Sequence, residues 1–206
     1  MASAASATPP TQRTVAGTAL TAAAAIVSLV ALAGSLYLSL GMDLKACPLC
    51  FYQRTFVMGV VAVLCLGLLL PGVRTSALNV LALPLAVSGL AIAVFHVNLE
   101  ATGVLECPTG MFGYGSAPQQ SLTIYVLLVL LLALALIVDA LRRPVDLLMG
   151  ASAIVVGLLL ALGSICSTPP SPEPKQAYNL PVDKDGCRKP FKGEQPPLRV
   201  GPRAVQ

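Results

Sequence analysis

Apolar residues in this chain of 206 residues form long uninterrupted blocks, and charged residues mark the ends of the blocks. No charged residue occurs between Arg13 and Asp43, between Arg54 and Arg74, or between Arg74 and Glu100. A bilayer core of ~30 Å needs ~20 helical residues, and helices that are apolar on every face suit contact with lipid. The pattern therefore predicts an all-α integral membrane protein. The expected transmembrane helices are 17–40, 51–70, 77–97, 120–141 and 145–165.

Composition supports a membrane protein. Hydrophobic residues make up 56% and charged residues 11% of the chain, whereas an average soluble domain is ~25% charged. This excludes a cytosolic enzyme, a disordered chain and a small disulfide-stapled secreted domain. The net charge of +4 is too small to indicate binding to nucleic acid. The first block could be a signal peptide, but its apolar stretch exceeds the usual ~7–15 residues.

The basic residues of the short loops predict the orientation. Arg13, Arg74, Arg142 and Arg143 fall on one side, and Lys45 and Arg54 fall on the other. This distribution favours a cytoplasmic amino terminus. The basic tail, 166–206, opposes it, because five spans place the tail outside. The tail is also rich in proline, and we expect 190–206 to be an extended, solvated segment.

The six cysteines divide into one within a span and five outside. Cys65 lies deep in the second span and is interpreted as a small packing residue. With five spans, the remaining five fall on one side of the membrane, which favours an oxidising compartment and disulfide chemistry. These five are Cys47, Cys50, Cys107, Cys166 and Cys187.

Cys47 and Cys50 form a Cys-Pro-Leu-Cys motif at the start of the second span. Unpaired backbone N–H groups at a helix amino terminus stabilise a thiolate, and Pro48 suits the first helical turn. Arg54 follows Cys50 by one turn on the same face, where a charge is costly unless it has a partner or a function. The motif predicts a redox-active pair. The alternatives are half of a zinc site and an inert structural disulfide.

The run Cys47-Pro-Leu-Cys-Phe-Tyr-Gln-Arg54 resembles the start of the second helix in the DsbB family of disulfide bond formation proteins. The similarity extends over roughly 20–140 and includes the turn at 71–76, His96 and an outer loop with Cys107. It implies a four-helix membrane domain. The expected division is a cytoplasmic segment 1–16, the DsbB-like bundle 17–141, an added transmembrane helix 142–165 and the extracytoplasmic tail 166–206.

The resemblance implies a quinone-linked thiol oxidase in the bacterial cytoplasmic membrane. Family members oxidise a soluble DsbA-like, thioredoxin-fold partner and pass the electrons to ubiquinone or menaquinone. Carried over by position, Cys50 contacts the quinone, Cys47 resolves it and Arg54 holds a quinone oxygen. His96 is expected beside the quinone with Glu100 as its partner, although a single histidine at a span end is more commonly an interfacial residue. No metal is expected.

The chain departs from the family in its outer cysteines. The family has four spans and two cysteines in the second outer loop, whereas the loop 98–120 contains only Cys107. One added span moves the tail to the side of Cys107. We hypothesise that Cys187 is its partner. A Cys166–Cys187 bridge stays open as an alternative, and Cys107–Cys166 is less favoured because Cys166 is tethered at a helix end. Each pairing leaves one outer thiol over.

Two other classes of function compete. One is an outward-directed thiol reductase, similar to vitamin K epoxide reductase or to enzymes that reduce apocytochromes. The other is a non-enzymatic scaffold with structural disulfides. Arg54 favours an enzyme, because a scaffold needs no guanidinium beside a thiol. The sequence leaves open whether the fifth span packs against the bundle or only delivers the tail.

Overall fold

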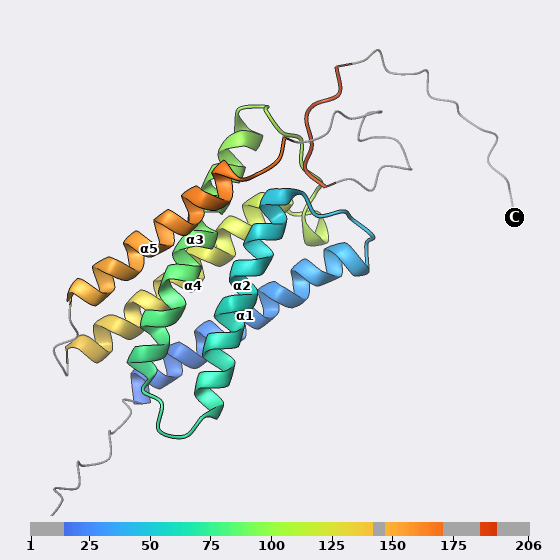
Figure 1. Ribbon diagram of the computed structural model, residues 1–206. Helices are drawn as coiled ribbons and strands as arrows, with labels where there is room; N and C mark the ends of the chain where they lie inside the picture. Colours follow the sequence, from blue (N-terminus) through green and yellow to red (C-terminus); the bar gives the residue numbers. More distant parts are fainter. Residues whose placement is uncertain (1–14, 142–146, 171–185, 193–206) are drawn as a thin grey trace, which may run out of the picture.

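The computed structural model describes residues 15–141, 147–170 and 186–192, and the long helices in these ranges pack side by side in one elongated bundle (Figure 1). The helices are α1 (Val15–Leu40), α2 (Pro48–Leu69), α3 (Thr75–Ala101), α4 (Ala117–Ala140) and α5 (Leu147–Cys166), with a short 3₁₀ turn, η1 (Met111–Gly113). Five helices, α5 counted from Met149, are long and apolar enough to cross a membrane. The predicted all-α membrane fold is confirmed. The segment 1–14 and the tail end 193–206 lie outside the described residues.

Helices α2 and α4 begin three residues earlier than the sequence pattern predicted, because both starts are capped. In α2, Cys47 is the N-cap and Pro48 occupies the first helical position. In α4, Ser116 and Gln119 form a reciprocal capping box, each side chain bonding the backbone of the other. The apolar blocks mark the membrane core, whereas the caps extend the helices beyond it. The Cys-Pro-Leu-Cys motif therefore lies inside a rigid first turn.

Helices α1 to α4 form a closed bundle in which α3 is the most buried helix. α3 packs on α2 and α4, and α1 closes the ring against both of these helices. The centre is filled by leucine and alanine side chains with no exposed surface: Leu64, Leu128, Leu132, Ala82 and Ala86. The small residues let the α3 backbone approach its neighbours closely, as is typical of membrane helices.

Helix α5 packs on the outer side of α3 (Figure 1). Ser88 Oγ of α3 donates to Gly157 O of α5 at 2.8 Å and to Pro84 O at 2.6 Å. A Cβ on Gly157 would lie 2.7 Å from Pro84 O, so only glycine allows this approach. The fifth span is therefore part of the packed structure, which fixes where the tail leaves the bundle.

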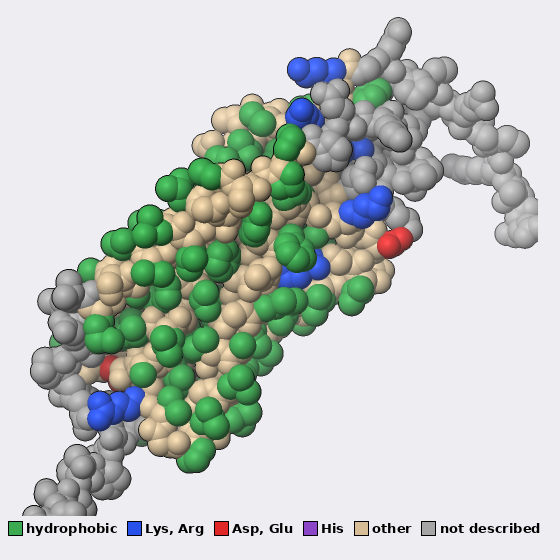
Figure 2. Space-filling view, viewed as in Figure 1, with side chains coloured by type: hydrophobic (Ala, Val, Ile, Leu, Met, Phe, Trp, Pro, Cys, Tyr) green, Lys and Arg blue, Asp and Glu red, His purple; other side chains and the backbone are tan. Residues whose placement is uncertain are grey.

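Charged side chains lie mainly at the two ends of the molecule on the face shown in Figure 2, and hydrophobic side chains cover the middle. Large apolar side chains such as Leu66, Leu81 and Leu130 are more than half exposed. Apolar exposure on this scale is typical of a lipid-facing surface. The structure and the composition agree on a multi-pass membrane protein.

Substituting Gly157 with leucine is expected to separate α5 from α3. The new side chain meets Pro84 O and Val87, and overpacking of this kind costs about 1–3 kcal/mol of stability. The thermal unfolding midpoint in detergent measures the effect. Gly163→Leu is the matched control, because nothing lies within 4 Å of its Cβ position. Equal midpoints for the two variants would contradict the packing described for α5.

Candidate redox site

The first turn of α2 holds Cys47 and Cys50 as free thiols with their Sγ atoms 2.7 Å apart. Cys47 is the N-cap, and its Sγ accepts the backbone N–H of Cys50 at 3.2 Å. The sulfur thus takes the place that a hydroxyl or carboxylate oxygen usually holds at a helix start. Cys47 is buried and Cys50 is half-buried, so the two sulfurs have different surroundings.

The pKa of Cys47 is lowered to about 5. The hydrogen bond from the Cys50 thiol is the largest cause, and it outweighs the opposing effect of burial. A hydrogen bond and the charge of His96 lower the pKa further, as does the backbone N–H of Cys50. At neutral pH the reduced pair therefore holds a thiolate on Cys47, the form that takes part in disulfide exchange.

Arg54 is fixed against α1. Its Nε donates to Ser35 Oγ at 2.9 Å, and its Nη2 donates to Ser35 O at 2.9 Å and to Ser39 Oγ at 2.5 Å. Arg54 lies one turn after Cys50 on α2. The two serines are partners that the sequence analysis missed, although they are polar residues spaced one turn apart in an apolar helix. They hold a cation in a defined position on the Cys50 side of α2.

Cys107 and Cys187 form a disulfide. The backbone around it pairs in an antiparallel bridge, with Glu106 N donating to Arg188 O at 2.7 Å and Arg188 N donating to Glu106 O at 2.9 Å. On the other side, a Cβ on Gly186 would lie 2.2 Å from Lys45 O. The tail segment 186–192 therefore runs between the two outer loops. The structure contains the pairing hypothesised for Cys187.

Cys166, the alternative partner, is free and exposed at the end of α5. Cys65 is also free and is half-buried within α2, where it packs against the main core. Neither the Cys166–Cys187 bridge nor the Cys107–Cys166 bridge is present, because Cys187 is bonded to Cys107. Cys166 is thus the outer thiol left over.

The two cysteine pairs meet at His96 of α3. The Sγ atoms of Cys47, Cys50 and Cys187 and a ring nitrogen of His96 all lie within 4.8 Å of one another. His96 Nε2 is 3.8 Å from Cys47 Sγ and 3.6 Å from Cys107 Sγ. The elements that converge here are far apart in sequence, so folding brings the outer disulfide directly against the inner pair.

The surroundings of His96 differ from those predicted. Its side chain is fully buried rather than interfacial. Glu100, the predicted partner, instead accepts a hydrogen bond from Ser116 Oγ at 2.6 Å. His96 Nδ1 has no hydrogen-bond partner in the part of the chain that the structure describes. The histidine lies among sulfurs, and the carboxylate anchors the start of α4.

Cys47, Cys50, Cys187 and His96 are also the ligand types of a zinc site. The sulfur of Cys187 is bonded to Cys107, however, and zinc ligation requires a thiolate. In the oxidised state of the outer pair, the cluster therefore offers at most two thiolates and one imidazole. A structural zinc site has four protein ligands, so these three would leave it incomplete. Two free thiols beside a disulfide instead favour thiol–disulfide exchange.

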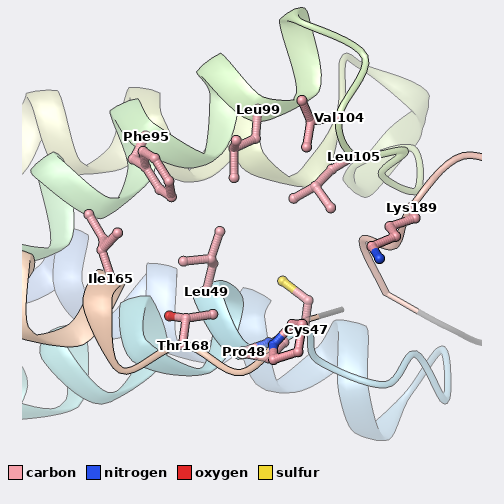
Figure 3. Close-up of a pocket in the computed structure, with 11 residues that line it drawn as sticks. Cys47, Pro48, Leu49, Phe95, Leu99, Val104, Leu105, Ile165, Thr168 and Lys189 are labelled. Atoms are coloured by element: carbon pink, nitrogen blue, oxygen red, sulfur yellow. The ribbon is translucent and has the colours of Figure 1, made fainter. Parts of the chain in front are cut away.

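An apolar pocket of about 270 Å³ opens beside Cys47 (Figure 3). Leu49, Phe95 and Leu99 form its walls, and Ile165 closes it from α5. The other residues that line it are Pro48, Val104, Leu105, Thr168, Pro170 and Lys189. The volume is just below the ~300–1,000 Å³ typical of small-molecule sites, which suits a single ring. The sequence had no signal for this pocket, because the residues that line it come from four separate segments.

Comparisons with known proteins identify the family of the chain. The profile of the family described as "Disulfide bond formation protein DsbB" matches residues 17–124. The chain is 29% identical over 106 residues to a "Probable disulfide formation protein" of Chlamydia muridarum, covering 47% of this chain and 76% of that protein. It is 30% identical over 110 residues to a "Probable disulfide formation protein C 2" of Bacillus anthracis, covering 48% and 76%. No solved structure matches the chain significantly.

Replacing Cys50 with alanine is expected to raise the pKa of Cys47 toward the ordinary thiol value of ~8.5, because the largest stabilising hydrogen bond is lost. A thiolate exists above the pKa. The alkylation rate of Cys47 in the reduced parent should therefore be near its plateau at pH 7 and fall below about pH 5. In the variant the rate should still rise at pH 8. Mass spectrometry of the Cys47 peptide measures both, with Cys65→Ala as control. If the alkylation rate of Cys47 in the variant still has its midpoint near pH 5, the hydrogen bond from Cys50 is not the cause of the lowered pKa.

Proposed function

Because the chain belongs to the DsbB family of disulfide bond formation proteins, we propose that it is a quinone-linked thiol oxidase acting on a thioredoxin-fold partner. The family gives it a membrane role in disulfide formation and a disulfide oxidoreductase activity. We further propose which molecule donates the electrons and which accepts them. A reduced DsbA-like protein supplies the electrons, and ubiquinone or menaquinone accepts them.

One observation carries the proposal: the Cys107–Cys187 disulfide lies against the Cys47 and Cys50 thiols. A structural disulfide needs no second cysteine pair beside it. Exchange between two pairs, in contrast, requires a sulfur of one pair to reach a sulfur of the other. The separation of at most 4.8 Å between the Sγ atoms of Cys187 and Cys47 supports a relay.

The proposed relay has three steps. The partner's dithiol attacks the outer disulfide through a mixed disulfide and leaves Cys107 and Cys187 reduced. The Cys187 thiolate then attacks Cys47 in the oxidised inner pair, so that the Cys47–Cys50 bond breaks and Cys50 leaves as a thiolate. Attack of Cys107 on Cys187 releases Cys47. The outer pair is thereby reoxidised, and the inner pair carries two electrons.

The inner pair passes these electrons to the quinone. We place the quinone ring at Cys50, since Cys47 faces the outer pair and Arg54 supplies a fixed cation on the Cys50 side. The serine contacts of Arg54 use Nε and Nη2. Nη1 makes none of these bonds, and it is the group we assign to a quinone oxygen. When bound, the quinone accepts two electrons and two protons and leaves as the quinol.

The proposed location is the bacterial cytoplasmic membrane, with the redox site at its outer surface. The described part of the chain places Lys45, Arg188 and Lys189 at the cysteine end and Arg74 at the other. Orientation then depends on Arg13, Arg142 and Arg143, which lie outside the described residues. They favour a cytoplasmic amino terminus by the positive-inside rule.

The oxidase proposal predicts quinone reduction by the purified protein when a reduced DsbA-like protein is supplied. Cys107→Ser and Cys187→Ser should each abolish turnover with the partner, because either change removes the outer disulfide. Cys166→Ser is the matched control and should retain full activity, since Cys166 is unpaired. Quinone absorbance follows the reaction. Full activity of Cys187→Ser, or loss of activity in Cys166→Ser alone, would overturn the relay.

The direction of electron flow is tested in the same preparation. An outward-directed reductase would reduce the oxidised partner when quinol is supplied, and it would leave quinone unreduced by the reduced partner. The oxidase predicts the opposite result. If quinol reduces the oxidised partner faster than the reduced partner reduces quinone, the protein is a reductase and the oxidase proposal is wrong.

The place of the quinone ring is tested by two variants on opposite sides of the motif. Arg54→Ala is expected to raise the quinone KM about 10- to 100-fold, because a charge-assisted hydrogen bond is worth about 1.5–3 kcal/mol. Ile165→Trp fills the pocket beside Cys47 and should leave the KM unchanged. The opposite pattern would move the ring from Cys50 into the pocket.

A further inference from the structure

His96 lies in an unusual position for a buried histidine. It has no exposed surface, and its Nδ1 has no hydrogen-bond partner in the described part of the chain. A buried polar atom without a partner is costly and needs an explanation. The groups that Nε2 approaches are two sulfurs, Cys47 Sγ at 3.8 Å and Cys107 Sγ at 3.6 Å. These two sulfurs belong to different redox pairs.

The exchange between the pairs moves protons as well as electrons. In the second exchange, the Cys107 thiol must lose its proton before its sulfur can attack Cys187. The same step releases Cys47, which leaves as a thiolate and stays a thiolate at neutral pH because its pKa is lowered to about 5. The step therefore frees a proton at Cys107 and leaves a negative charge at Cys47. His96 Nε2 lies within 4 Å of both sulfurs.

We propose that His96 is a catalytic residue that accepts the proton of Cys107 and stabilises the Cys47 thiolate during exchange between the two pairs. Nε2 takes the proton of the Cys107 thiol, and the Cys107 thiolate attacks Cys187 in the Cys187–Cys47 mixed disulfide. The Cys107–Cys187 bond forms, the Cys187–Cys47 bond breaks, and Cys47 leaves as a thiolate. The imidazolium then keeps the proton, and its charge stabilises the Cys47 thiolate. The outer pair loses two electrons, and the inner pair gains them.

Other ionisable groups surround this path. Cys50 and Cys187 complete the cluster at His96. Glu106 and Arg188 flank the outer disulfide in the backbone bridge. Arg54 lies one turn after Cys50, held by its bonds to Ser35 and Ser39. Among these groups, in the part of the chain that the structure describes, His96 is the one base whose ring nitrogen lies within 4 Å of a sulfur of each pair, so we assign the role of proton acceptor to His96.

The role of His96 rests on the proposed relay. The test therefore follows only the exchange between the outer pair and the inner pair. Protein freed of quinone, with both pairs oxidised, is mixed with reduced DsbA-like partner. Rapid alkylation and mass spectrometry then follow which pair holds the thiols over time. His96→Gln is expected to slow transfer from the outer to the inner pair about 100-fold, the usual contribution of a general acid or base. Reduction of the outer pair by the partner should keep its parent rate.

The pH profile separates proton transfer from a structural role. The parent rate should change little with pH near neutrality, whereas the His96→Gln rate should keep rising with pH as the Cys107 thiol ionises without help. If the glutamine variant misfolds, His96→Gly takes its place, and added imidazole is expected to restore its exchange. A variant with the parent's rate and profile, or a glycine variant without rescue, would overturn the role of His96. Failure of the parent to pass electrons inward would overturn the relay itself.

Discussion

Thiol–disulfide exchange needs sulfur atoms that can touch, and this requirement governs the outer end of the molecule. The inner pair is held rigidly in the first turn of α2, so the second pair has to come to it. Cys107 lies on the loop after α3, and Cys187 lies 80 residues further along the chain. The β bridge between Glu106 and Arg188 and the close approach of Gly186 to Lys45 hold the tail in this position.

The fifth helix gives this arrangement its physical basis. Because α5 packs on α3 through Ser88 and Gly157, the tail starts at a fixed place at the cysteine end. A chain with four spans would end on the other side of the membrane. The same helix contributes Ile165 to the pocket beside Cys47. One added helix therefore provides both the route for the distant cysteine and a wall of the redox site.

The two faces of the inner pair have different surroundings. Cys47 is buried against His96 and the outer disulfide, whereas Arg54 lies on the Cys50 side, braced by α1. The pKa of Cys47, lowered to about 5, makes it a good leaving group when the mixed disulfide is resolved. This asymmetry supports a division in which Cys47 exchanges with protein sulfur and Cys50 meets the quinone.

The helices could be predicted from the sequence because an apolar block of about 20 residues has one stable form in a bilayer. Pro48 and the Cys-x-x-Cys spacing suited a first helical turn, but the apolar pattern alone placed the start of this helix three residues too late. An odd number of spans places the tail on the same side of the membrane as Cys107. Together with the resemblance, this pointed to Cys187 as the partner of Cys107.

Other features could not be read from the sequence. The tail is held by backbone groups, which leave no residue pattern. His96 is buried among sulfurs that folding brings to it, so the alternative interpretation of His96 as an interfacial residue at a span end was wrong, and its expected partner Glu100 instead bonds Ser116. The pocket could not be predicted either, because Phe95, Ile165 and Lys189 meet only after α5 and the tail have packed.

The most direct test of the central claim is to trap the bond between the two pairs. A variant with Cys50→Ala, Cys107→Ala and Cys166→Ser keeps the attacking sulfur of Cys187 and the attacked sulfur of Cys47 but removes the cysteines that normally pair with them. Mild oxidation followed by non-reducing digestion and mass spectrometry should yield a Cys47–Cys187 peptide as the main product. Cys47 and Cys187 recovered as separate peptides, in protein that is folded, would contradict direct exchange between the outer and inner pairs.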